Sequence, residues 1–130
     1  MIVLDTHVWL WWLSDPAKLS QPARETIEDA VAGDAIALSA ISAWELAMLV
    51  QRGRLALDRR PIDFVAATEA LPFVHVVDVD PRIAVDSVSL DLPHRDPADR
   101  MIAATARQLR APLVTKDARL REWGGVETVW

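Results

Sequence analysis

The chain has 130 residues, of which 52% are hydrophobic and 25% charged, a balance typical of one globular domain and not of a disordered segment. It contains no cysteine, which excludes a disulfide framework and any thiolate metal site. Its net charge of −5 argues against a protein that binds nucleic acid through a simple basic surface.

The amino terminus lacks the basic region and the long apolar stretch of a secretory signal. No segment approaches the ~20 apolar residues that a membrane span requires. We therefore expect a single domain over residues 1–130, located in the cytoplasm and not associated with a membrane.

Short apolar segments alternate with helical segments along the chain. In chain order, the pattern predicts a strand at 1–5, a helix at 6–13, a helix at 20–31, a strand at 35–38, a helix capped by Ser39 or Ser42 and ending near Gly53, a helix at 61–71, a strand at 73–77, a helix at 81–90, a loop at 92–97, a helix at 98–109, a strand at 113–115, a helix at 116–123 and a strand at 126–129. This alternation predicts βαβ units, and therefore a parallel sheet covered by helices on both faces.

Four acidic residues lie in strongly apolar surroundings. Asp5 closes the first apolar strand, and Asp117 follows the apolar segment 113–115. Glu45 and Asp99 lie in the first or second turn of their helices, on faces that otherwise pack inward. An isolated carboxylate on such a face costs several kcal/mol unless it is paired, and a metal ion is the usual partner of a group of them.

All four carboxylates can meet at one edge of the sheet, because open parallel sheets bind ligands at the carboxyl ends of their strands. Oxygen ligands without histidine or cysteine at ligand spacing favour Mg²⁺ or Mn²⁺ over Zn²⁺. Two such ions about 4 Å apart can activate a water and stabilise the leaving oxygen of a phosphodiester.

Each acid also has a purely structural interpretation. Asp5 and Asp117 can cap the helices that follow them, and Glu45 can be the capping-box partner of Ser42. Asp99 can be an acid favoured by the helix dipole. Taken singly, these interpretations are as plausible as a metal role, but together they leave the shared sheet edge unexplained.

Four motifs in this order resemble those of PIN-domain proteins. They are Asp5-Thr6-His7, the segment from Ser39 to Leu46 (SAISAWEL), the segment from His94 to Ala106 (HRDPADRMIAATA), and Val114-Thr115-Lys116-Asp117. The likeness spans nearly the whole chain and is greatest to the VapC-type toxins of bacterial toxin–antitoxin pairs.

The resemblance implies a three-layer α/β/α sandwich with a mostly parallel central sheet of four to five short strands. It implies an endoribonuclease that depends on one or two Mg²⁺ or Mn²⁺ ions, cuts RNA, is held inactive by a small cognate antitoxin and usually forms a homodimer. The family's catalytic and metal-binding acids fall on Asp5, Glu45, Asp99 and Asp117. Asp96 is an ambiguous fifth acid, and Asp99 is favoured because it lies on the inward helical face.

Five further residues are candidates for supporting or substrate-contacting roles. Thr6 and Thr115 can orient carboxylates or satisfy local backbone groups. Lys116 is expected near the substrate. His94 and Arg100 flank the acids and can contact phosphate or the leaving group, although a structural role for His94 and an exposed ion pair for Arg100 are open alternatives.

The first helix carries an apolar stripe that includes Trp9 and Trp12, with Trp11 and Leu13 beside it. Such a stripe is more often core, but the number of large rings indicates a remainder that is exposed at an antitoxin groove or a dimer surface. Base stacking is a weaker alternative.

Two other functions fit parts of the sequence. A phosphoacceptor receiver domain would need Asp78 or Asp80 as the phosphorylated residue, and it gives no reason for inward acids at Glu45 and Asp99. A catalytically inactive PIN-like binding module is the other alternative, against which the intact set of four acids argues.

Overall fold

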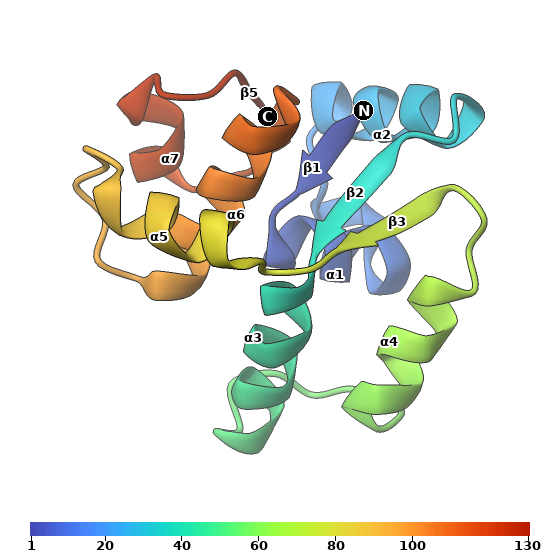
Figure 1. Ribbon diagram of the computed structural model, residues 1–130. Coiled ribbons are helices and arrows are strands. Elements are labelled where there is room, and N and C mark those ends of the chain that lie inside the picture. The colour runs from blue at the N-terminus through green and yellow to red at the C-terminus, as the bar shows by residue number, and fades with distance from the viewer.

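A five-stranded parallel sheet forms the centre of the protein in a computed structural model that describes all residues from 1 to 130 (Figure 1). The strands are β1 (Ile2–Leu4), β2 (Ile36–Ser39), β3 (Val74–Val77), β4 (Leu113–Val114) and β5 (Thr128–Val129). Their order across the sheet is β3-β2-β1-β4-β5, and every neighbouring pair is parallel. The predicted mostly parallel sheet of short strands is confirmed.

Helices connect the strands and cover both faces of the sheet. They are α1 (Thr6–Ser14), the 3₁₀ turn η1 (Pro16–Lys18), α2 (Gln21–Ala32), α3 (Ala40–Gln51), α4 (Pro61–Glu69), α5 (Pro81–Ser89), α6 (Pro97–Leu109) and α7 (Ala118–Trp123). Side chains of α1, α2 and α4 pack into the hydrophobic core on one face, and those of α5, α6 and α7 into the core on the other. The three-layer α/β/α sandwich is therefore confirmed.

Successive side chains of β1 point alternately into the two hydrophobic cores, which lie on opposite faces of the sheet. Ile2 and Leu4 belong to the core beneath α1 and α2, whereas Val3 belongs to the core beneath α6. Successive side chains of a strand point to opposite faces, so a strand buried on both sides is apolar at every position. This is why the first strand is an unbroken apolar run.

The tryptophan stripe of α1 is mainly core, as its apolar spacing indicates. Trp9 is fully buried, its ring packs edge-on against Phe64, and its Nε1–H donates to Thr68 Oγ1 at 3.1 Å. Trp12 is half-buried and packs against Phe73. Among the large apolar residues of α1, Leu13 is the exposed one.

Two details of the predicted elements need correction. Ser39, and not Ser42, caps α3, because the Ser39 side chain accepts from the N–H of Ile41 while Ser42 lies within the helix. The capping-box interpretation of Glu45 is therefore wrong. The turn η1 was not predicted. For most of the other helices and strands, the observed ends differ from the predicted ends by one or two residues. No helix is both long and apolar enough to cross a membrane.

Candidate metal centre at the carboxyl edge of the sheet

The predicted acids converge on one cavity at the carboxyl ends of β1 and β4, next to the point where the strand order reverses. The cavity has a volume of about 400 Å³, and its lining residues are Asp5, His7, Trp11, Glu45, Asp96, Asp99, Lys116 and Asp117. All four predicted acids and the ambiguous fifth acid are in this set. Five carboxyl groups thus share a space with one lysine and one exposed histidine.

Asp5 follows β1 directly and is buried. Its Oδ1 accepts from the N–H of Thr6 at 2.7 Å, so Asp5 caps α1, and its Oδ2 accepts from the Thr115 hydroxyl at 2.7 Å. Burial is the main cause that raises the pKa of Asp5 above its ordinary value, despite these bonds. The capping interpretation is correct, but it is compatible with a further role, because each carboxylate oxygen has a second lone pair.

Glu45 and Asp99 project into the cavity from α3 and α6. Glu45 is buried, and its Oε1 has no hydrogen-bond partner. Burial raises the pKa of Glu45, with repulsion from Asp5 and Asp96 adding to it. Burial, together with repulsion from all four other acids, raises the pKa of Asp99 to about 8. These carboxyl groups are destabilised as bare anions.

Asp96 and Asp117 lie at helix starts on either side of this pair. Asp96 caps α6 by accepting from the N–H of Ala98, and Asp117 caps α7 through its Oδ1. The possible ligand atoms form two groups, and within each group all of these atoms lie within 4.8 Å of one another. One group consists of Glu45, Asp96 and Asp99, and the other of His94, Asp99 and Asp117. Asp99 belongs to both groups.

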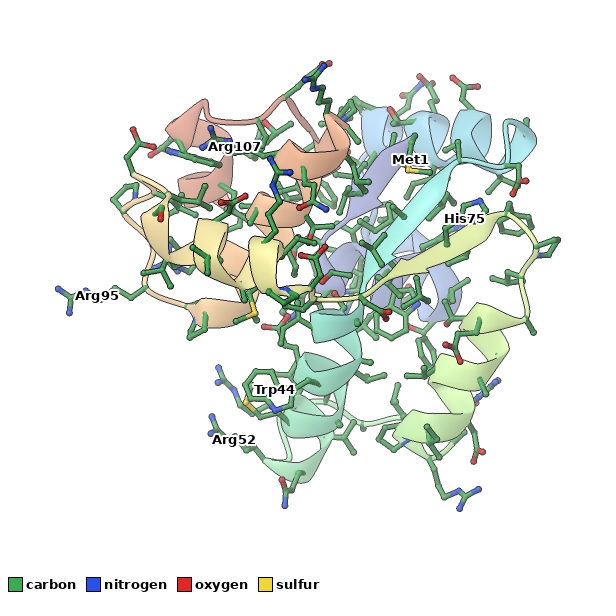
Figure 2. All side chains as sticks on the ribbon, viewed as in Figure 1. Met1, Trp44, Arg52, His75, Arg95 and Arg107 are labelled. Atoms are coloured by element: carbon green, nitrogen blue, oxygen red, sulfur yellow. The ribbon has the colours of Figure 1, made fainter.

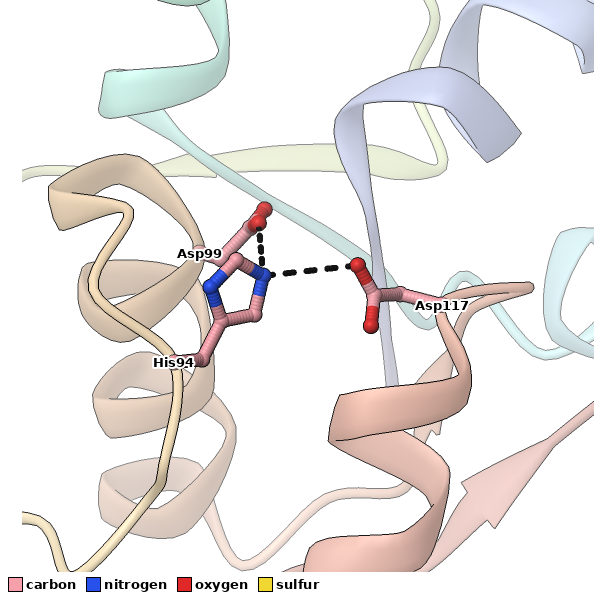
Figure 3. Close-up of side chains that lie close together, drawn as sticks. All are labelled: His94, Asp99 and Asp117. Atoms are coloured by element: carbon pink, nitrogen blue, oxygen red, sulfur yellow. Dashed lines mark ion pairs between the residues drawn. The ribbon is translucent and has the colours of Figure 1, made fainter.

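His94 is buried, and its ring lies beside Asp99 and Asp117 (Figure 3). Its Nε2 is 2.6 Å from Asp99 Oδ2 and 3.4 Å from Asp117 Oδ2. Neither contact has the alignment of a regular hydrogen bond. Nε2 therefore lies between the two carboxylates without a hydrogen bond to either. On the other side of the ring, the backbone N–H of Asp96 donates to Nδ1 at 3.3 Å.

The residues present fit a hard divalent cation. The donor set consists of carboxylate oxygens, which Mg²⁺ and Mn²⁺ prefer. The unpartnered buried Oε1 of Glu45 and the raised pKa of Asp99 both indicate a cluster that needs positive charge for its ionised form. A bound cation would be held by Glu45, Asp99 and Asp96 or Asp117, with Asp5 adjacent.

The two threonines have different partners. Thr115 Oγ1 donates to Asp5 and also accepts from the N–H of Asp117 at 3.0 Å, so it links two of the acids. Thr6 Oγ1 donates to Ser42 Oγ at 2.9 Å and thereby joins α1 to α3 below the cavity. Both threonines and Ser42 are fully buried.

Arg100 does not face the cavity, contrary to the expectation that it contacts phosphate. Its guanidinium donates to five backbone carbonyl oxygens, those of Ser87, Val88, Leu90, Leu92 and His94, at 2.6–3.2 Å. A guanidinium has five N–H groups, and each is used here. Arg100 therefore fixes the connection between α5 and α6, and it forms no exposed ion pair.

His7 and Trp11 also line the cavity, although neither was among the site residues predicted from the sequence. They stand one helical turn apart on α1, with ring centroids 5.8 Å from each other. The Lys116 ammonium lies 5.7 Å from the centroid of the Trp11 ring, a cation–π distance. The i, i+4 spacing of His7 and Trp11 was the available signal, since it places both side chains on one face of α1.

A family model described as "PIN domain" matches residues 2–126 of the chain. The chain belongs to the PIN-domain family. Among curated proteins, this PIN-domain chain is 39% identical over 121 residues to "Ribonuclease VapC22" of Mycobacterium tuberculosis (strain ATCC 25618 / H37Rv). That alignment covers 92% of this chain and 89% of the relative.

Solved structures show the same fold. One is "VapBC2 from Rickettsia felis bound to a DNA fragment from their promoter", with a TM-score of 0.71 at 17% identity over 98% of this chain and 97% of that chain. Another is a "Toxin-antitoxin complex from Klebsiella pneumoniae", with a TM-score of 0.64 at 20% identity over 97% and 95%. At this level of identity, the likeness establishes the PIN fold alone.

Membership of the PIN-domain family makes the receiver-domain alternative wrong. Asp78 and Asp80 follow β3, which is an edge strand of the sheet, and neither lines the acidic cavity. Asp80 caps α5 by accepting from the N–H of Ile83 at 2.8 Å. A receiver domain would require its phosphorylated aspartate after a central strand.

Proposed function

We propose that this PIN-domain protein is a divalent-metal-dependent endoribonuclease and the toxin of a toxin–antitoxin pair. The observation that carries the proposal is the convergence of Asp5, Glu45, Asp99 and Asp117 on one cavity from four separate elements. The similarity to a relative named as a ribonuclease supports the choice of substrate. The reaction is hydrolysis of a phosphodiester: water adds to phosphorus and one P–O bond breaks.

The metal is Mg²⁺ or Mn²⁺, with one or two ions held by Asp5, Glu45, Asp99 and Asp117, and with Asp96 as a further ligand candidate. When bound, such an ion activates a water and neutralises charge that develops on the phosphate oxygens. Glu45 and Asp99 supply ligands from α3 and α6, and burial raises the pKa of both carboxyl groups. Asp5 and Asp117 complete the acidic wall at the ends of β1 and β4.

The remaining residues of the cavity orient the acids and the RNA. Thr115 holds Asp5 through its hydroxyl and fixes the position of Asp117 through its oxygen. Lys116 is the cavity's one lysine and is suited to an electrostatic contact with a substrate phosphate. Trp11 and His7 offer ring faces at the rim, against which a base can stack.

The proposed partners are a small antitoxin and a second copy of the chain. Exposed apolar side chains support a protein interface. They include Leu13 on α1 and Trp44 on α3, which Figure 2 labels. Two of the solved structures with this fold are complexes according to their descriptions. An RNA target and an antitoxin partner both agree with a cytoplasmic location.

The test is cleavage of labelled RNA by the purified protein with Mg²⁺ or Mn²⁺, with a chelator, and with Ca²⁺ as competitor. We expect cleavage that the chelator abolishes and that Ca²⁺ inhibits, because calcium fills oxygen sites but often fails to support the chemistry. Metal binding without cleavage of any RNA would favour the inactive binding module. Cleavage that persists in the chelator would contradict the proposed mechanism.

A further inference from the structure

A single side chain bonds both the last turn of α5 and the connection from α5 to α6. Arg100 follows Asp99 on α6, and its guanidinium bonds the carbonyls of five residues between 87 and 94. The last of these is the His94 carbonyl, which accepts from Nη1 at 2.9 Å. The backbone of His94 is thereby tied to the helix that carries Asp99.

A bond within the same segment determines which ring nitrogen of His94 accepts a hydrogen bond and which one can donate. The Asp96 N–H donates to Nδ1, so in the neutral ring the proton resides on Nε2. The Nε2 atom is shielded from water and faces the oxygens of Asp99 and Asp117 (Figure 3). An Nε2 that carries the proton presents a positively polarised N–H to these carboxylates at 2.6 and 3.4 Å, although neither contact is aligned as a regular hydrogen bond. Such a nitrogen cannot bind a metal ion.

We propose that His94 is a positioning residue of the metal centre, which presents its Nε2–H to Asp99 and Asp117 and keeps their oxygens turned toward a shared cation. This inference rests on the proposed function for the presence of the cation. It removes His94 from the possible ligands and leaves the carboxylates of Glu45, Asp96, Asp99 and Asp117 to hold the metal.

The proposal explains why a histidine is buried among acids. Five carboxyl groups in one cavity repel each other, and an N–H donor between two of them reduces that repulsion without occupying the cavity. Donors behind metal-binding carboxylates commonly fix the ligand geometry, and their loss costs roughly 10–100-fold in metal affinity or activity. The Arg100 bond to the His94 carbonyl fixes the backbone from which the imidazole projects.

The first test measures Mn²⁺ affinity by calorimetry for the wild-type protein, His94→Gln and His94→Leu. Glutamine keeps an N–H donor on a side chain of comparable reach, whereas leucine keeps only the bulk. We expect His94→Leu to lose about 10–100-fold in affinity and His94→Gln to retain most of it. The matched control is His75→Gln, since His75 is exposed on β3 (Figure 2). Equal affinities for folded His94→Leu and wild type would overturn the proposal.

The second test needs no variant and therefore does not depend on whether His94→Leu folds. Nitrogen chemical shifts of ¹⁵N-histidine-labelled wild-type protein report the tautomer of each ring, with and without Mg²⁺. We expect His94 to carry its proton on Nε2 in both states. An Nε2 that loses its proton when metal is added would show direct ligation and overturn the proposal. If wild type binds no metal, the proposed function fails, and the tautomer still reports the His94 contact.

Discussion

Thr115 Oγ1 donates a 2.7 Å hydrogen bond to Asp5 Oδ2, joining residues that are 110 positions apart in the chain. The bond crosses from the end of β4 to the end of β1, where the strand order reverses. Because the hydroxyl also accepts from the N–H of Asp117, one side chain sets the relative positions of two acids. Two acids of the candidate metal centre are therefore held in place by a residue at the carboxyl edge of the sheet.

Replacing Thr115 by valine should weaken metal binding. The change removes the donor to Asp5 and the acceptor for Asp117 with little loss of volume, leaving a buried carboxylate oxygen without its partner. We expect Mn²⁺ affinity to fall about 10–100-fold in calorimetric titration. Thr105→Val is the matched control, because Thr105 is equally buried but bonds only the Met101 carbonyl in its own helix. Equal affinities for Thr115→Val and wild type would contradict the role assigned to the hydroxyl.

The metal-free protein should lose stability as the pH rises. Asp99 has its pKa raised to about 8 by burial and by neighbouring acids, against about 3.9 in an unfolded chain. Between these two pKa values the folded state keeps a proton on Asp99, whereas the unfolded state has released it. Binding of this proton stabilises the folded state, and that contribution is lost as the pH rises toward 8. Between pH 5.5 and 8.5 the free energy of unfolding should fall, by at most about 1.4 kcal/mol per pH unit from this group.

Two comparisons check that assignment. Denaturant unfolding of Asp99→Asn without metal should show a much flatter pH dependence than that of the wild type. Saturating Mn²⁺ at pH 8.5 should restore the stability of the wild type, because a ligand that binds only the folded state stabilises it. Identical pH profiles for the two metal-free proteins would show that Asp99 is not the titrating group.

Lys116 should contribute to RNA binding and not to metal binding. Its ammonium lines the acidic cavity above the Trp11 ring. Replacement by glutamine should raise KM for RNA and reduce the salt dependence of RNA binding by about one phosphate contact. The other lysine, Lys18, forms an exposed pair with Asp15 at 3.8 Å, so Lys18→Gln is the control. A lower Mn²⁺ affinity in Lys116→Gln, with unchanged KM, would reverse the assignment.

The sequence was sufficient to predict the sheet and the convergence of the acids. Asp5 and Asp117 follow apolar strands, and Glu45 and Asp99 stand at apolar helical spacing, so βαβ topology alone directs them to one edge. Asp99 was favoured over Asp96 because it lies on the inward helical face, but both acids line the cavity.

The roles of the neighbouring polar residues could not be predicted in the same way. The hydroxyls of Thr6 and Thr115 find partners 36 and 110 residues away, and such partners depend on tertiary packing. Arg100 follows Asp99 in sequence, yet it points to the carbonyls of the α5–α6 connection. Adjacent positions on a helix face different directions, so nearness to a catalytic motif does not place a side chain in the site.

Cleavage of RNA by Asp99→Asn with saturating Mn²⁺ or Mg²⁺ tests the central claim most directly. The substitution removes the negative charge of Asp99, the one residue that belongs to both groups of possible ligands, and it relieves repulsion in a buried cluster. We predict that cleavage falls to background while the metal-free variant melts at or above the wild-type temperature. Cleavage at the wild-type rate by the folded variant would contradict a carboxylate metal centre as the source of activity.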